Sequence, residues 1–178
     1  MKGTSRTNAM KAWLAALWVL SVCFFLIISI GPSALAQNDA VPQPVRIDFV
    51  DHRTIPEPFT GTWSATGAFG DSGTSQQSFF LSGSWPPATG HIDHILTSSV
   101  GTIHIRSQVS FVWSMESFHD HTTEGQFTII SGTGAYMGLH GRGTISMAVD
   151  FTPVVTPSGP SFHVVITGSY VGEANFAP

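Results

Sequence analysis

The sequence has almost no cysteine and few basic residues. It contains one cysteine, Cys23, and two lysines, Lys2 and Lys11, and all three precede residue 36. Beyond that point the sequence therefore predicts no disulfide framework, no thiolate metal site and no cysteine nucleophile. It also contains no P-loop, dinucleotide fingerprint or nucleophile elbow, so no cofactor is expected.

Positive charge is scarce after residue 36, where four arginines face eleven carboxylates and the net charge is about −7 with neutral histidines. Scattered arginines cannot form a basic patch, so neither nucleic acid nor an anionic membrane surface is an expected partner. The four arginines are Arg46, Arg53, Arg106 and Arg142.

The N-terminal segment has the three parts of a secretory signal peptide. A basic start is followed by apolar residues 12–30, the helix-breaking pair Gly31-Pro32 and the small-residue site Ala34-Leu35-Ala36. This order predicts cleavage near Ala36, secretion to the periplasm or the medium, and no stable membrane association afterwards. An uncleaved anchor is one alternative, because residues 12–30 approach the ~20 that span a bilayer. Lipidation at Cys23 is another.

The chain is predicted to comprise a signal peptide (1–36), a polar, proline-bearing linker (37–44) and one domain (45–178). A domain of this size can bury roughly two thirds of its unfolded surface and needs no disulfide.

Apolar and polar residues alternate with a period of two, which is typical of half-buried strands. In residues 102–114, Ile103, Ile105, Val109, Phe111 and Trp113 share one face. Residues 59–69 and 144–151 behave likewise, and weaker strands are predicted at 45–50, 76–82, 91–99, 124–131 and 162–171. Glycine, serine and proline separate about eight strands, which favours an eight-stranded antiparallel up-and-down β-barrel, with a sandwich as the alternative.

The most specific segment is residues 130–145, with the sequence ISGTGAYMGLHGRGTI. Its glycine spacing predicts a tightly folded turn between two strands, because glycine reaches positive φ without steric cost. Tyr136 and Leu139 are expected to fold back over one end of the barrel. A turn without any chemistry is the favoured interpretation of this segment.

This segment resembles the GTGxYxGLxGxG signature of secreted bacterial proteins with an allene oxide cyclase barrel-like domain, and plant allene oxide cyclases and dirigent proteins carry a related turn. Residues 61–69 (GTWSATGAF), 71–73 (DSG) and 168–172 (GSYVG) agree, so the resemblance covers residues 59–176. It implies an eight-stranded calycin-like barrel and a homo-oligomer, often a trimer in the plant proteins. It assigns no pocket residue here, and fold does not fix function.

Three residues are candidates for ligand binding. His94 shares its strand face with Ile92 and Leu96, which indicates a core or pocket histidine. His104 and Arg106 share the polar face of residues 102–114. If that face lines the lumen, they can bind a carboxylate, and if it faces water, they only solubilise the strand.

A weak metal candidate is formed by His119, His121 and Glu124, since two imidazoles and a carboxylate suit zinc, iron, copper or manganese. The alternative is a polar hairpin tip, and no metal is expected.

The sequence favours a secreted barrel that binds a small apolar ligand. One alternative is a cyclase or isomerase that steers the conformation of a lipid-derived substrate, which needs few charged groups. The other is a structural or interaction barrel without a small ligand. Whether the protein is an enzyme is left open, with the balance against it.

Overall fold

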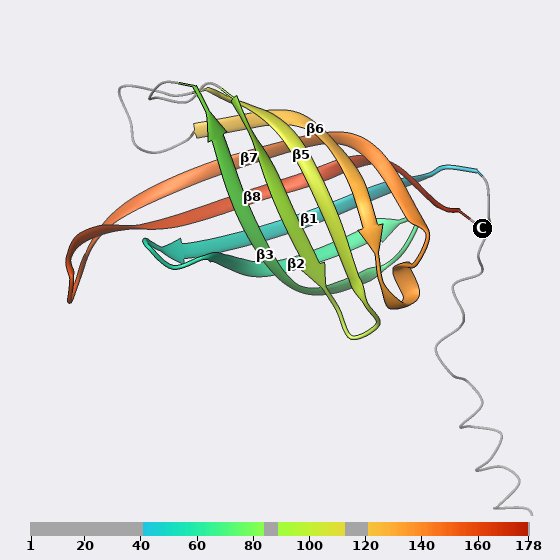
Figure 1. The fold of residues 1–178 in the computed structure, drawn as a ribbon, viewed down its shortest axis with the longest axis horizontal. Coiled ribbons are helices and arrows are strands. Elements are labelled where there is room, and N and C mark those ends of the chain that lie inside the picture. The colour runs from blue at the N-terminus through green and yellow to red at the C-terminus, as the bar shows by residue number, and fades with distance from the viewer. Residues whose placement is uncertain (1–40, 84–88, 113–120, 178) are drawn as a thin grey trace, which may run out of the picture. The chain divides into compact units, whose positions relative to one another are not determined.

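The computed structural model describes residues 41–83, 89–112 and 121–177, which form a barrel of eight strands (Figure 1). The predicted signal peptide and the first half of the linker lie outside these residues, and β1 begins two residues before the predicted start of the domain. The strands are β1 (Gln43–Thr54), β2 (Phe59–Gly67), β3 (Asp71–Ser82), β4 (Thr89–Thr97), β5 (Thr102–Val112), β6 (His121–Gly132), β7 (Leu139–Thr156) and β8 (Gly159–Phe176).

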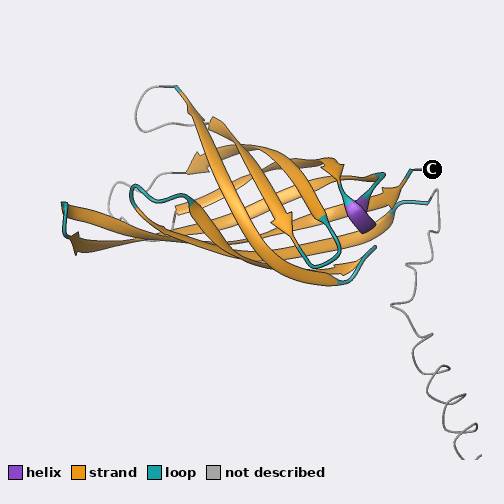
Figure 2. Cartoon of the chain, turned by 60° about the horizontal axis from the view of Figure 1, so that its bottom comes forward, coloured by secondary structure: helices purple, strands orange, loops and turns teal. Residues whose placement is uncertain are grey.

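Each strand pairs antiparallel with the next, and β8 pairs back with β1 from Gln43↔Ala174 to Thr54↔His163. This pairing closes the barrel and leaves no sheet edge along its circumference. The predicted up-and-down barrel is therefore confirmed, and the sandwich alternative was wrong. Figure 2 shows strands almost throughout, with the 3-10 helix η1 (Gly134–Tyr136) at one end. Within the described ranges, no helix has the length and apolarity needed to cross a membrane.

The core lies inside the barrel and is built from the faces that alternation predicts. Ile103, Ile105 and Val109 of β5 are buried, whereas Thr102, His104 and Arg106 point outward. The inward apolar residues of β2 and β7 are also buried, namely Phe59, Trp63, Ala65, Ile145, Met147 and Val149. Trp113, predicted to share the inner face of β5, lies outside the described residues.

The glycine-rich segment closes the barrel end at which the C-terminus lies (Figure 1). Tyr136 and Leu139 are both 1% exposed, as expected of side chains that fold back over this end. The Tyr136 hydroxyl donates a hydrogen bond to the Asp71 carboxylate and lies 3.3 Å from Ser98 Oγ. Gly134 has φ +61°, a left-handed conformation that glycine adopts readily. The turn therefore ties the start of β3 to the β4–β5 connection.

Two connections between the predicted strands are shorter than expected. Residues 70–75 lay between the predicted strands 59–69 and 76–82, but β3 starts at Asp71 and Gly73 pairs with Trp63. A Cβ on Gly73 would lie 1.9 Å from the Thr97 carbonyl oxygen, so this glycine permits close strand approach and marks no turn.

The β7–β8 hairpin also extends further than the predicted strands 144–151 and 162–171 and projects beyond its neighbours (Figure 2). Its register runs to Thr156↔Gly159, whereas the described β6–β7 pairing ends at His121↔Val149. Pro153 pairs with Phe162 of β8 and does not end β7.

Candidate functional site

A layer of polar side chains crosses the barrel interior. Six polar or charged residues are at most 5% exposed, and the fully buried Tyr170 lies among them. We call this set the inner polar layer, and its members are Asp51, Ser75, Gln77, His94, Ser107, Thr123 and Tyr170. They belong to six different strands, so only closure of the barrel brings them together.

A glycine on β2, between β1 and β3, allows two members of the inner polar layer to contact each other. Asp51 of β1 pairs with Gly61 of β2, and Gly61 pairs with Ser75 of β3. A Cβ on Gly61 would lie 2.5 Å from Asp51 Oδ1. Because glycine leaves that space empty, Ser75 Oγ donates a hydrogen bond to Asp51 Oδ1 across the intervening strand.

The imidazole of His94 lies between a carboxylate and a phenol. His94 Nδ1 is 2.9 Å from the Tyr170 hydroxyl oxygen, and His94 Nε2 is 3.2 Å from Asp51 Oδ2. A carboxylate only accepts hydrogen bonds, so a proton on Nε2 suits this contact and leaves Nδ1 to accept from the phenol. The Nε2–Asp51 contact is electrostatic, because neither atom makes a hydrogen bond of ordinary geometry within the described residues.

Aromatic rings surround this contact and exclude water. The Phe49 ring lies edge-on to the His94 ring, with the ring centroids 4.8 Å apart. The ring centroids of Phe49 and Phe127 each lie 5.1 Å from that of Tyr170. Burial strongly raises the pKa of Tyr170 because a phenolate would be poorly solvated, and Asp51 adds repulsion. Tyr170 therefore stays protonated as a hydrogen-bond donor at neutral pH.

Several polar atoms of the layer have no hydrogen-bonding partner among the described residues. These include both ends of the Gln77 amide and the hydroxyls of Ser107 and Thr123. Gln77 and Ser107 face the Tyr170 hydroxyl and offset part of its raised pKa, although neither forms a hydrogen bond of ordinary geometry. Buried polar groups of this kind cost about 1–3 kcal/mol each unless water or a ligand satisfies them. The layer therefore has unused capacity to bind a polar group.

The structure separates the three predicted ligand-binding residues. His94 points into the barrel and is fully buried, while His104 and Arg106 lie on the outer face. There both contact Asp93, with Arg106 Nε at 2.8 Å and His104 Nε2 at 3.3 Å from Oδ1. The hydrogen bond from Arg106 lowers the pKa of Asp93 despite partial burial. His104 and Arg106 thus lie on the water-facing side that the sequence left open.

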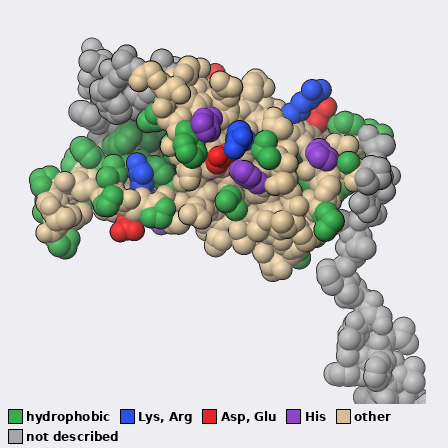
Figure 3. Space-filling model, in the orientation of Figure 1, with side chains coloured by type: hydrophobic (Ala, Val, Ile, Leu, Met, Phe, Trp, Pro, Cys, Tyr) green, Lys and Arg blue, Asp and Glu red, His purple; other side chains and the backbone are tan. Residues whose placement is uncertain are grey.

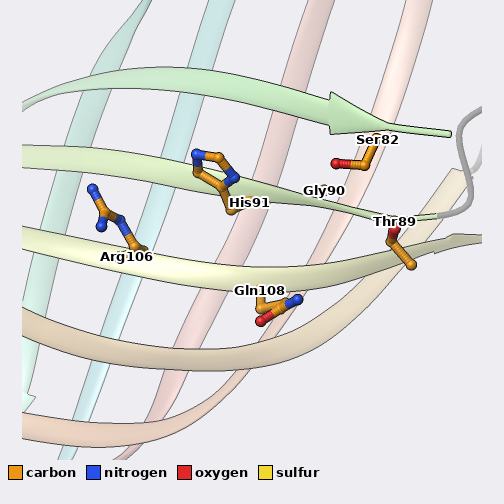
Figure 4. A pocket seen from close by; sticks show the side chains of 6 residues that line it. All are labelled: Ser82, Thr89, Gly90, His91, Arg106 and Gln108. Atoms are coloured by element: carbon orange, nitrogen blue, oxygen red, sulfur yellow. The ribbon is translucent and has the colours of Figure 1, made fainter.

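An open hollow of about 270 Å³ lies next to this outer cluster, and Figure 4 shows its lining. The lining residues are Ser82, Thr89, Gly90, His91, Arg106 and Gln108. Figure 3 shows basic, acidic and histidine side chains close together on this face, with apolar ones among them. Phe80 stacks on His91 with ring centroids 4.5 Å apart. The hollow is on the outer surface and does not reach the inner polar layer.

The weak metal candidate cannot be assembled from the described side chains. His119 and the side chain of His121 lie outside them, and Glu124 is exposed on the outer face of β6. Within the described part of the chain, no group of three histidine, cysteine or acidic residues could hold a metal ion.

The sequence interpretation missed most of the inner polar layer, although a signal was present. Val45, Ile47 and Phe49 alternate along β1, and Asp51 continues the same inward face. The predicted strand stopped at residue 50, one residue short of it. Tyr170 and Gln77 gave no comparable signal, because polar and apolar residues mix around them.

The comparisons with known proteins find no relative. No protein-family model matches the sequence, and neither a curated protein nor a solved structure matches it. The eight-stranded barrel is compatible with the fold that the resemblance of residues 59–176 implies.

Proposed function

We propose that the protein acts outside the cytoplasm as a barrel that binds a small, largely apolar ligand, one polar group of which contacts the inner polar layer. The observation that carries this proposal is the unused hydrogen-bonding capacity of Gln77 and Ser107 beside the Tyr170 hydroxyl. Buried polar groups without partners are normally satisfied by water or a ligand.

The surroundings of these atoms define the chemistry of the ligand. The Gln77 amide both donates and accepts, and the Tyr170 oxygen can accept while its own proton is donated to His94 Nδ1, so a ligand hydroxyl is the fitting partner. The rings of Phe49 and Phe127 adjoin this position, so the rest of the ligand is apolar. A few convergent polar groups in an apolar setting are typical of small-molecule sites.

A second candidate function is isomerase or cyclase chemistry on such a ligand. It is favoured by the sequence of contacts from Asp51 through His94 to Tyr170, in which a carboxylate orients an imidazole towards a phenol. In this function a substrate hydroxyl would give its proton to the Tyr170 oxygen as the phenolic proton passes to His94 Nδ1. Asp51 would stabilise the resulting imidazolium, and the proton would return to the rearranged product by the same path.

Native mass spectrometry of the protein secreted by its own host tests the binding proposal. We expect a mass above that of the polypeptide, which denaturing extraction releases as a small organic compound. A polypeptide without added mass that also takes up no apolar fluorescent probe would contradict the proposal. A structural or interaction role without a small ligand would then be the better supported function.

A further inference from the structure

Arg53 is the inward-facing cation of the described barrel. It follows Asp51 by two residues on β1, so both side chains lie on the inner face. Its guanidinium carbon lies 4.1 Å from the centroid of the Phe59 ring, and Phe59 is 6% exposed. The other described arginines, Arg46, Arg106 and Arg142, are on the outer face.

Arg53 has no carboxylate partner among the described residues, although the chain carries an excess of acidic groups. Its Nε is buried without a hydrogen bond. In contrast, Arg46 pairs with Asp48 at 2.7 Å, and Arg106 pairs with Asp93 at 2.8 Å. Desolvation lowers the pKa of Arg53, and no charge in the described part of the chain offsets this effect.

The nearest inward carboxylate along the strand is already in use. Asp51 accepts from Ser75 and contacts His94, and it makes no ion pair with Arg53. The face of the Phe59 ring supports the planar guanidinium, and Phe59 packs on Phe79 at 5.2 Å. A rigid fork of donors over an aromatic surface is suited to bind an oxyanion.

We infer that Arg53 binds an oxyanion group, a carboxylate or a sulfonate, on the ligand of the barrel. This inference rests on the proposed function, because it specifies the ligand that the inner polar layer receives. The ligand therefore carries an anionic group in addition to the oxygen that meets Gln77 and Tyr170.

Two fluorescent probes with the same ring system isolate the charge. The anion 1-anilinonaphthalene-8-sulfonate and the neutral N-phenyl-1-naphthylamine both brighten in apolar sites, and the first differs by its sulfonate. Each is titrated against the mature protein and against Arg53→Gln, Arg53→Lys and Arg142→Gln. The last variant removes the same charge from an exposed position on the outer face of β7.

We expect the wild type to bind the sulfonate at least about tenfold more tightly than the neutral probe. Arg53→Gln should abolish this preference, Arg53→Lys should retain part of it, and Arg142→Gln should keep it. Equal binding of both probes that is insensitive to Arg53→Gln would overturn the anion site and leave the binding function standing. If neither probe binds, the proposed function itself fails and this inference fails with it.

Discussion

His94 Nδ1 lies 2.9 Å from the hydroxyl oxygen of Tyr170, although 76 residues separate the two in the chain. Both side chains are fully buried, and the imidazole also contacts the Asp51 carboxylate. Burying two titratable side chains costs folding free energy unless their polar atoms have hydrogen-bonding partners. The contact with Asp51 and the mutual hydrogen bond offset part of this cost.

Removal of the phenolic oxygen tests the His94–Tyr170 contact. Tyr170→Phe leaves His94 Nδ1 buried without its partner, so the free energy of unfolding should fall by about 1–3 kcal/mol. Urea denaturation measures this change. Thr144→Val is the control, because the Thr144 hydroxyl is exposed and makes one long hydrogen bond of 3.4 Å, and its effect should stay within about 0.5 kcal/mol. Equal effects of the two substitutions would show that the contact contributes nothing.

Gly61 provides the space that Asp51 occupies. A Cβ at this position would lie 1.9 Å from the Val50 carbonyl oxygen and 2.5 Å from Asp51 Oδ1. Gly61→Ala should therefore lower the free energy of unfolding by at least about 3 kcal/mol or prevent folding. Gly70→Ala is the matched control, since its Cβ would meet no atom within 4 Å, and it should fold with stability close to that of the wild type.

Gln77 and Gln76 are neighbours on opposite faces of β3, so one tests the binding site and the other is its control. Gln77→Leu removes a buried amide without hydrogen bonds, so the free energy of unfolding should stay the same or rise. The fraction of protein that carries the bound mass in native mass spectrometry should fall at least about tenfold. Gln76→Leu, on the outer face, should leave the bound mass unchanged. Loss of stability in Gln77→Leu with the bound mass retained would mean that the amide serves the core.

The chain contains two tyrosines, and both should resist ionisation in the folded protein. Burial, together with the hydrogen bond to Asp71, raises the pKa of Tyr136 to about 12, and burial raises the pKa of Tyr170 further. An ultraviolet titration of the folded protein should show no tyrosinate signal near pH 10, where the urea-unfolded chain titrates.

The same pKa shifts determine how stability depends on alkaline pH. A pKa that is raised on folding stabilises the protein fully below the unfolded value of about 10 and loses this effect as pH rises towards the folded value. The free energy of unfolding should therefore fall between pH 10 and 12, and less steeply in Tyr136→Phe. A tyrosinate signal at pH 10 in protein that remains folded would contradict the burial of both phenols.

Much of the barrel was predictable because strand alternation is a local property. The inward residues of β2, β5 and β7 follow from the period of two, and the glycine-rich turn from its spacing. Strand ends were less predictable, because Gly73 permits close strand approach inside β3 and Pro153 lies inside β7, paired with Phe162. From the sequence alone, a glycine or proline inside a strand cannot be distinguished from one in a turn.

The candidate site was only partly predictable. His94 was assigned to an inward face from its neighbours Ile92 and Leu96, but Asp51 lay one residue beyond a predicted strand end. His104 and Arg106 have the residue types of a binding site, and their side of β5 became known only from the closed sheet.

The sequence by itself determined which residues alternate, where the chain turns and that eight strands are available, because these depend on neighbours a few positions apart. The tertiary structure decided which face is the interior and which distant residues meet there. Asp51, His94 and Tyr170 come from β1, β4 and β8, and only the strand register around a closed barrel brings His94 within about 3 Å of both other residues. That register depends on pairing across the whole domain, which no local pattern encodes.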